Sequence, residues 1–291
     1  MRSKKFVAFV LIPIFLLLFV FLVLPLFYGL GISFFDYNPL RSENPFVGLD
    51  NFKKLFSDPI FFKALGNTFL FVFVTVAINI ALTLMLAQFI TVLPSNRLRG
   101  FFRMVFFLPC VAPIVAASSV WGSRIFSTKT GVLNSLLVAL GKQPINFLGT
   151  ADLVMWALIA FSVWVDFGYN TILFSAGMDS IPHTYQEAAK IDGANAWQRF
   201  IHITLPLLRR TFVFVTIMTL ISHFEMFVQF MSLAHRGGPN YASTVLTLYV
   251  YKLGFMNKDM GYASAVALVL FAIIMVITLL QKRFTKVDWE Y

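Results

Sequence analysis

Residues 178–210 read MDSIPHTYQEAAKIDGANAWQRFIHITLPLLRR, a polar stretch between two apolar ones. The first half predicts a short helix, because Pro182 can begin a helix and Thr184 and Glu187 have the spacing of a capping box. Gly193 is expected to end this helix, since the residue after a helix often adopts a left-handed conformation that glycine tolerates.

The second half predicts another short helix. Asn195 can cap it, and Trp197, Phe200 and Ile201 then share one face. Pro206 returns the chain to an apolar segment. A small two-helix element with a sharp turn indicates a docking surface for another protein.

On both sides of this stretch the chain is unusually apolar. Hydrophobic residues make up 59% of the 291 positions and charged residues 12%, whereas soluble domains carry about 25% charge. A membrane-spanning helix needs about 20 mostly apolar residues. Six runs qualify: 6–35, 68–92, 101–121, 153–178, 211–233 and 261–281. We therefore predict an all-α integral membrane protein with six transmembrane helices.

The first run has the charged start of a secretory signal peptide, because Arg2, Lys4 and Lys5 precede it. Its 30 residues exceed the apolar region of a signal peptide, which is about 7–15 residues long. We interpret it as a retained span in which Pro13 and Pro25 are tolerated.

Lysine and arginine set the expected orientation. With a cytoplasmic N-terminus, the inside segments hold 13 of these residues in 59 positions, and the outside segments hold 10 in 90. The positive-inside rule then predicts that both termini are cytoplasmic. The formal net charge of +10 is assigned to loops that face anionic lipid, and no nucleic-acid partner is expected.

Three features of the stretch 178–210 carry a family resemblance. They are the triplet Glu187-Ala188-Ala189, then Gly193, then Ile203, Leu205 and Pro206, which together fit EAA-x3-G-x9-I-x-LP. The pattern resembles the EAA loop of binding-protein-dependent ABC importers. The fuller form EAA-x2-DGA-x2-W-x2-F-x2-I-x-LPLL is similar to the carbohydrate-uptake branch, as are VGLDNF at 47–52, GVLN at 131–134 and GGP at 237–239.

The resemblance implies a type I ABC importer permease of the bacterial cytoplasmic (inner or plasma) membrane, similar to the first permease of maltose- and glycerol-3-phosphate-type systems. It implies an N-terminal helix and external segment at 1–62 and a transmembrane core at 63–291, with the EAA loop at 179–210. Its implied partners are a second homologous permease, two ATPase subunits, an extracellular or periplasmic binding protein, a sugar and membrane lipid.

The resemblance also implies that the EAA loop sits in a cleft of an ATPase subunit. The residues expected to couple the two proteins are Glu187, Ala188, Ala189, Asp192, Gly193, Ala194, Trp197, Phe200 and Pro206. Alternatives remain for the two acids, because Glu187 is also suited to a helix cap and Asp192 to a turn.

Polar residues inside the spans are the candidate substrate pathway, because an ionisable group in a membrane span usually faces a cavity or a partner. Asp166 and Asn170 are four residues apart, as are Glu225 and Gln229, so each pair is expected to share a helical face. Tyr169 and Trp121 are candidate aromatic covers for a sugar. The alternative is polar contact between spans, including a local contact between Glu225 and His223.

Two other classes of membrane protein compete with a transport subunit. A membrane enzyme gains no support, because the four histidines form no metal-binding pair and no G-x-S-x-G motif occurs. An autonomous secondary transporter would leave the EAA loop unexplained. The chain has no phosphate-binding loop, so ATP and Mg²⁺ are expected on the ATPase partners, with no cofactor or metal on this chain. A non-sugar solute, such as a polyol or glycerol phosphate, stays open.

Overall fold

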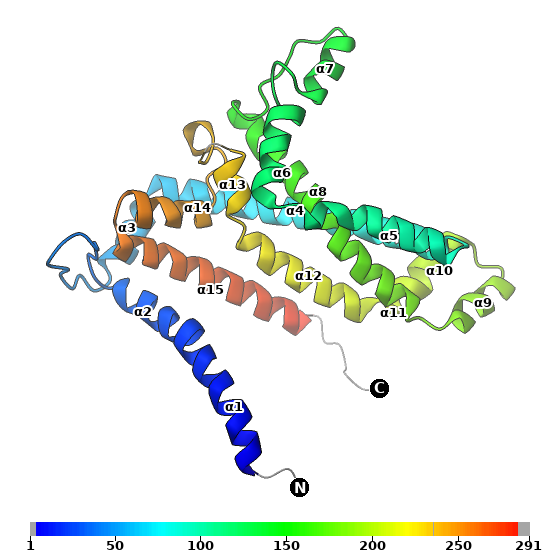
Figure 1. Ribbon diagram of the computed structural model, residues 1–291, viewed down its shortest axis with the longest axis horizontal. Coiled ribbons are helices and arrows are strands. Elements are labelled where there is room, and N and C mark those ends of the chain that lie inside the picture. The colour runs from blue at the N-terminus through cyan, green and yellow to red at the C-terminus, as the bar shows by residue number, and fades with distance from the viewer. Residues whose placement is uncertain (1–3, 235, 285–291) are drawn as a thin grey trace. The chain divides into compact units, whose positions relative to one another are not determined.

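The computed structural model describes residues 4–234 and 236–284, which are mostly helical (Figure 1). The longer α-helices are α1 (Lys4–Leu18), α2 (Leu24–Ile32), α3 (Asp50–Ser57), α4 (Pro59–Val92), α5 (Asn96–Val111), α6 (Ile114–Val120), α7 (Val132–Ala139), α8 (Ala151–Asp179), α9 (His183–Ile191), α12 (Arg209–Phe224) and α15 (Met260–Phe284). The shorter ones are α10 (Ala196–Arg199), α11 (Leu205–Leu207), α13 (Val228–Ser232) and α14 (Leu246–Tyr251). Turns of π-helix lie at Phe19–Val23, Trp121–Ile125, Phe200–Thr204 and Lys252–Met256, and a 3₁₀ turn at Pro239–Tyr241.

Five helical segments of the described chain are long and apolar enough to cross a membrane. They are Phe6–Ile32, Pro59–Val92, Ala151–Asp179, Arg209–Ser232 and Met260–Arg283. A bent pair, Asn96–Val111 with Ile114–Ile125, makes a sixth if it counts as one span. The prediction of an all-α membrane protein is confirmed, while the cytoplasmic placement of both termini stays a prediction.

The third apolar run, 101–121, is divided between two helices. Its two halves are bent by 92°, and the break falls at Ala112 and Pro113. Ala112 is extended, with φ −68° and ψ 131°, because a proline disfavours helical backbone at the residue before it. The proline itself has no N–H to continue the helix.

The first run accommodates its second proline by a local change of helix type. Five residues of π-helix, Phe19–Val23, directly precede α2, in which Pro25 occupies the first turn. At this junction the Leu24 N–H bonds to Phe19 O, five residues back. A π-turn of this kind absorbs the interruption of the hydrogen-bond ladder that a proline causes.

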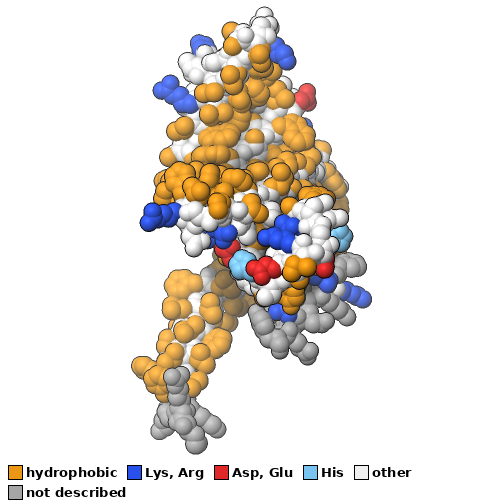
Figure 2. All heavy atoms as spheres, turned by 90° about the vertical axis from the view of Figure 1, so that its right-hand side faces the viewer, with side chains coloured by type: hydrophobic (Ala, Val, Ile, Leu, Met, Phe, Trp, Pro, Cys, Tyr) orange, Lys and Arg blue, Asp and Glu red, His pale blue; other side chains and the backbone are white. Residues whose placement is uncertain are grey.

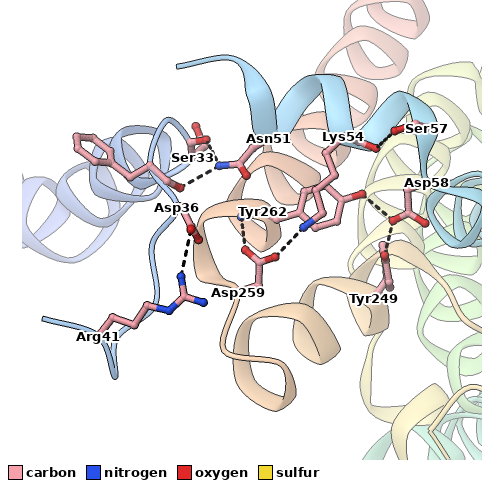
Figure 3. Close-up of polar contacts among 11 residues, drawn as sticks. Ser33, Asp36, Arg41, Asn51, Lys54, Ser57, Asp58, Tyr249, Asp259 and Tyr262 are labelled. Atoms are coloured by element: carbon pink, nitrogen blue, oxygen red, sulfur yellow. Dashed lines mark hydrogen bonds and ion pairs between the residues drawn. The ribbon is translucent and has the colours of Figure 1, made fainter. Parts of the chain in front are cut away.

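The chain forms two compact units, one of residues up to Phe62 with Tyr249–Ala272 and the other of Lys63–Leu248 with the residues from Ile273. In the first unit, buried Asn51 donates to Ser33 O and Phe35 O. In the same unit Asp58 accepts hydrogen bonds from Tyr249 and Tyr262 (Figure 3). The functional division into 1–62 and 63–291 stays a prediction.

The second unit holds α5 and α8 side by side (Figure 1). Gly168 of α8 makes this approach possible, because a Cβ built there would lie 2.0 Å from the carbonyl oxygen of Phe106 on α5. On α4, Thr75, Asn79 and Thr83 are fully buried at a spacing of four residues. That spacing places them on one face, from which Asn79 accepts a hydrogen bond from Asn170 of α8.

Candidate functional site

A cavity of about 370 Å³ lies among α5, α8 and α12 in the second unit. Its lining residues are Phe107, Cys110, Val165, Asp166, Tyr169, Asn170, Met218, Thr219, Ser222 and His223. An apolar wall with a few convergent polar groups is typical of small-molecule sites.

Asp166 and His223 face each other across this cavity. Asp166 Oδ2 lies 3.7 Å from His223 Nε2, and the His223 side chain is almost fully buried. The other ring nitrogen, Nδ1, lies 2.8 Å from the backbone oxygen of Thr219. A carbonyl oxygen only accepts hydrogen bonds, so Nδ1 carries the proton of this contact. The opposite edge of the ring, with Nε2, faces the Asp166 carboxylate.

Asn170 and Tyr169 also reach the cavity, but they differ in their surroundings. The Asn170 amide donates to Asn79 Oδ1 at 2.7 Å and to Thr219 Oγ1 at 3.0 Å. These bonds tie α8 to α4 and α12, which is the interspan contact considered as the alternative. Tyr169 is exposed. Its side chain makes no hydrogen bond to another residue that the structure describes.

The remaining three predicted pathway residues lie outside the lining of this cavity. Glu225 is exposed at the C-terminal end of α12, and Gln229 is buried in α13. The helix is interrupted between them, where Phe227 has the non-helical angles φ −134° and ψ −46°. The prediction that Glu225 and Gln229 share one helical face is therefore wrong. Trp121 packs its ring against Phe161 and Trp164, at 5.5 and 5.2 Å between centroids.

Sequence reasoning missed His223 as a member of the cavity and considered it only as a neighbour of Glu225. In the described chain its Nε2 faces the Asp166 carboxylate. A usable signal was present, since His223 lies four residues after Thr219 and one after Ser222, which makes one polar strip within an apolar run.

The EAA loop forms the expected two helices with a turn at Gly193. This residue has φ +81°. The Gly193 N–H bonds to Lys190 O and the Ala194 N–H to Ala189 O, at 3.1 and 2.9 Å, which is a Schellman ending of α9. The capping box expected at Thr184 and Glu187 is wrong, because α9 already begins at His183 with Pro182 as its cap.

Asn195 caps the second helix as predicted, and it does so in a full capping box. Its side chain accepts from the Gln198 N–H at 2.9 Å, while Gln198 Oε1 accepts from the Asn195 N–H at 2.8 Å. Arg199 Nη1 donates to Ala194 O at 2.7 Å. These bonds hold the connection between α9 and α10 from both sides, because the N–H groups of Gly193 and Ala194 bond back to α9, while the Ala194 carbonyl and Asn195 bond to α10.

Large apolar side chains project from this two-helix element. Tyr185, Ile191 and Trp197 are 54%, 87% and 69% exposed. Figure 2, which views the end of the second unit formed by α9 and α10, shows charged side chains gathered there beside an otherwise apolar surface. Exposed aromatic and aliphatic anchors within a charged rim are typical of protein–protein contact surfaces.

Polar contacts lie at the start of the EAA loop and within it. Arg103 of α5 donates to Ser175 Oγ and pairs with Asp179 at the end of α8, at 2.6 and 2.5 Å. Gln186 of α9 donates to Thr204 Oγ1 at 3.0 Å. The first set of contacts joins α5 to the end of α8, where the EAA loop begins, and the second holds α9 to the π-turn Phe200–Thr204 within the loop.

Two kinds of known sequence match this chain. A family model described as binding-protein-dependent transport system inner membrane component matches residues 79–286. The probable ABC transporter permease protein YurN of Bacillus subtilis is 33% identical over 99% of both chains. The arabinooligosaccharides transport system permease protein AraP of the same species is 32% identical over 84% of this chain and 78% of its own.

A solved structure has the same fold. A chain of the bacterial alginate ABC transporter, crystallised with its alginate pentasaccharide-bound periplasmic protein, superposes with a TM-score of 0.86 at 25% identity. The match covers 97% of this chain and 94% of that chain. The chain therefore belongs to the family of binding-protein-dependent transport system inner membrane components, as a multi-pass ABC transporter permease that is not itself catalytic.

Proposed function

We propose that this chain forms half of the translocation pathway of an ATP-driven importer for a sugar or oligosaccharide. The observation that carries the proposal is that one polypeptide holds a cavity with polar groups within its spans and a two-helix element that lies in the chain between α8 and α12, two of the helices that line this cavity. Relatives named for arabinooligosaccharides and for alginate support a saccharide as the solute.

The partners follow from this role. A second permease of the same family completes the pathway, a binding protein delivers the solute, and two ATPase subunits supply the energy. ATP and Mg²⁺ bind to the ATPase subunits, since this chain has no phosphate-binding loop. The alginate structure, with its bound periplasmic protein, supports the delivery step.

The EAA loop is the proposed contact with an ATPase subunit. Ile191 and Trp197 insert as apolar anchors, because they are the most exposed large side chains of the element. Glu187 and Asp192 are exposed beside them and supply charge at the rim. Gly193 keeps α9 and α10 at a fixed angle, which a contact that transmits movement requires.

The cavity with Asp166, His223 and Tyr169 is the proposed place where this chain contacts the solute. A carboxylate accepts hydrogen bonds from sugar hydroxyls, and an exposed tyrosine ring covers the apolar face of a sugar. Asn170 keeps the cavity in shape through Asn79 and Thr219. Glu225, Gln229 and Trp121 contact solute, in this proposal, only in other states of the transport cycle.

Uptake of labelled sugars tests the proposal. Cells that lack the gene should lose accumulation of one saccharide, and the wild-type gene should restore it. A variant with Asp166→Ala should assemble with its partners and import that saccharide poorly, whereas Asp152→Ala, an exposed acid at the start of α8, should import normally. Loss of uptake of a polyol or glycerol phosphate alone would contradict the saccharide assignment.

A further inference from the structure

The charged and titratable groups around the cavity of the second unit are few. Asp166, His223, Cys110 and Tyr169 line it, and none of its lining residues is lysine or arginine. The basic residue Arg103 on α5 is already occupied, because it bonds to Ser175 and Asp179. Among the residues that the structure describes, a solute that enters therefore meets one acid and no lysine or arginine in the lining.

The Asp166–His223 pair does not supply a positive charge either. With Nδ1 donating to Thr219 O, the pair holds at most one further proton in ordinary conditions, either on His223 Nε2 or on the carboxyl group. The pair is then neutral with that proton and negative without it. At 3.7 Å the two groups are too far apart for a good hydrogen bond, and Asp166 Oδ2 and His223 Nε2 have no such bond within the described chain.

Two buried polar atoms left without hydrogen bonds are expensive unless something else satisfies them. Sugar hydroxyls can do so, because a hydroxyl both donates to the carboxylate and accepts from a ring N–H. An ammonium group can also donate to the carboxylate. A solute carboxylate or phosphate group brings no donor for the Asp166 carboxylate and adds negative charge to a site whose acid is negative or neutral.

We propose, building on the proposed function, that Asp166 and His223 make this cavity a charge filter that admits neutral and basic saccharides and excludes acidic ones. The fold itself does not set this preference, because a transporter with the same fold is described as importing an acidic polysaccharide, alginate. Asp166 is the residue that determines the sign of the filter, and His223 lies opposite its carboxylate.

The test measures the charge preference of the cavity itself, without knowledge of the natural solute. A reporter thiol is placed by Ser222→Cys in a Cys110→Ser background, in the full complex in membrane vesicles. It is treated with two methanethiosulfonates of similar size, one with a trimethylammonium group and one with a sulfonate group. The ratio of their rates is divided by the ratio measured on free 2-mercaptoethanol.

The normalised ratio should favour the cationic reagent by about tenfold or more, since charged clefts concentrate ions of opposite sign to that extent. Asp166→Asn should bring the ratio close to one, while Asp152→Asn at the start of α8 should leave it unchanged. Native Cys110 also lines the cavity. In the unmodified chain it should likewise react faster with the cationic reagent than with the anionic one.

A ratio near one in the complex with Asp166 present would overturn the filter, as would a thiol at both positions that reacts with neither reagent. These outcomes are separate from the fate of the proposed function. A complex that discriminates between the reagents but imports no saccharide would contradict the sugar assignment and leave the filter intact. A complex that imports saccharide but does not discriminate between the reagents would contradict the filter and leave the sugar assignment intact.

Discussion

Gly168 of α8 lies so close to the Phe106 carbonyl oxygen of α5 that a Cβ on Gly168 would overlap it, at 2.0 Å. The obstacle is backbone and not a flexible side chain, so it cannot move aside by a rotamer change. The packing of the two helices that carry Cys110 and Asp166 therefore depends on the absence of a side chain at one position, as with other small residues at membrane helix contacts.

We expect Gly168→Ala to separate α5 from α8 and to lower the thermal stability of the purified complex. Core overpacking typically costs about 1–3 kcal/mol. The matched control is Gly66→Ala on α4, where a Cβ meets nothing within 4 Å and alanine favours helix. Thermal unfolding followed by calorimetry should show the loss only for Gly168→Ala, and equal midpoints for the two variants would contradict the packing.

Gly193→Val should abolish uptake while leaving the amount of permease in the membrane near normal. No atom lies within 4 Å of a Cβ at this position, so the penalty comes from φ +81° alone. Left-handed backbone costs about 1–2 kcal/mol for a residue with a side chain, and asparagine tolerates it better. Gly193→Asn should therefore retain much of the uptake, and a Gly193→Val variant that transports normally would show that the turn is dispensable.

Removing the exposed anchors should weaken ATPase binding without unfolding the permease. We expect Ile191→Ala and Trp197→Ala each to reduce co-purification of the ATPase subunit, since hot-spot truncations cost about 2 kcal/mol or more. Leu140→Ala is the control, because Leu140 is 73% exposed but lies after α7, outside the EAA loop. Binding that survives both anchor variants would place the ATPase contact elsewhere.

A fourth prediction concerns the polar cluster of the first unit (Figure 3). Burial acts to raise the pKa of Asp58, but the hydrogen bonds from Tyr249, Tyr262 and the backbone outweigh it, so the pKa lies below its ordinary value. A depressed carboxyl pKa stabilises the folded state above the unfolded pKa, and this stabilisation is lost as the pH falls through the folded value. Thermal stability should accordingly decline in acid.

Asp58→Asn should remove that part of the acid dependence and lower the unfolding temperature at neutral pH, because bonds to a charged group are stronger than neutral ones. Asp50→Asn is the control, since Asp50 and its partner Lys53 are both exposed and such pairs contribute little. Parallel pH profiles for wild type and Asp58→Asn in a scanning unfolding measurement would contradict the role of this carboxylate.

Much of the architecture could be predicted because single residues set it locally. Apolar length fixes the spans, Gly193 needs a left-handed turn, and the oxygen of Asn195 caps a helix whatever surrounds it. The 92° bend after Val111 could not be read in the same way, because prolines in membrane helices often leave the span continuous, as Pro13 does within α1.

The cavity was only partly predictable for a different reason. Asp166 and Asn170 share a face because α8 runs unbroken through both, and periodicity applies there. Glu225 and Gln229 do not, because the helix stops at Phe224 with no proline or glycine to announce it. His223 and Asp166 lie on two different helices and are 57 positions apart in the sequence. A long-range contact of that kind depends on how the helices pack, which the periodicity of one helix does not reveal.

Energised transport by the assembled complex tests the central claim most directly. Proteoliposomes that contain this permease with its partner permease and ATPase subunits are loaded with ATP and Mg²⁺, and labelled saccharide with its binding protein is added outside. We predict accumulation that requires internal ATP, survives a protonophore and is lost with Gly193→Val. Accumulation without ATP that collapses with the protonophore, or uptake by this chain alone, would contradict the account.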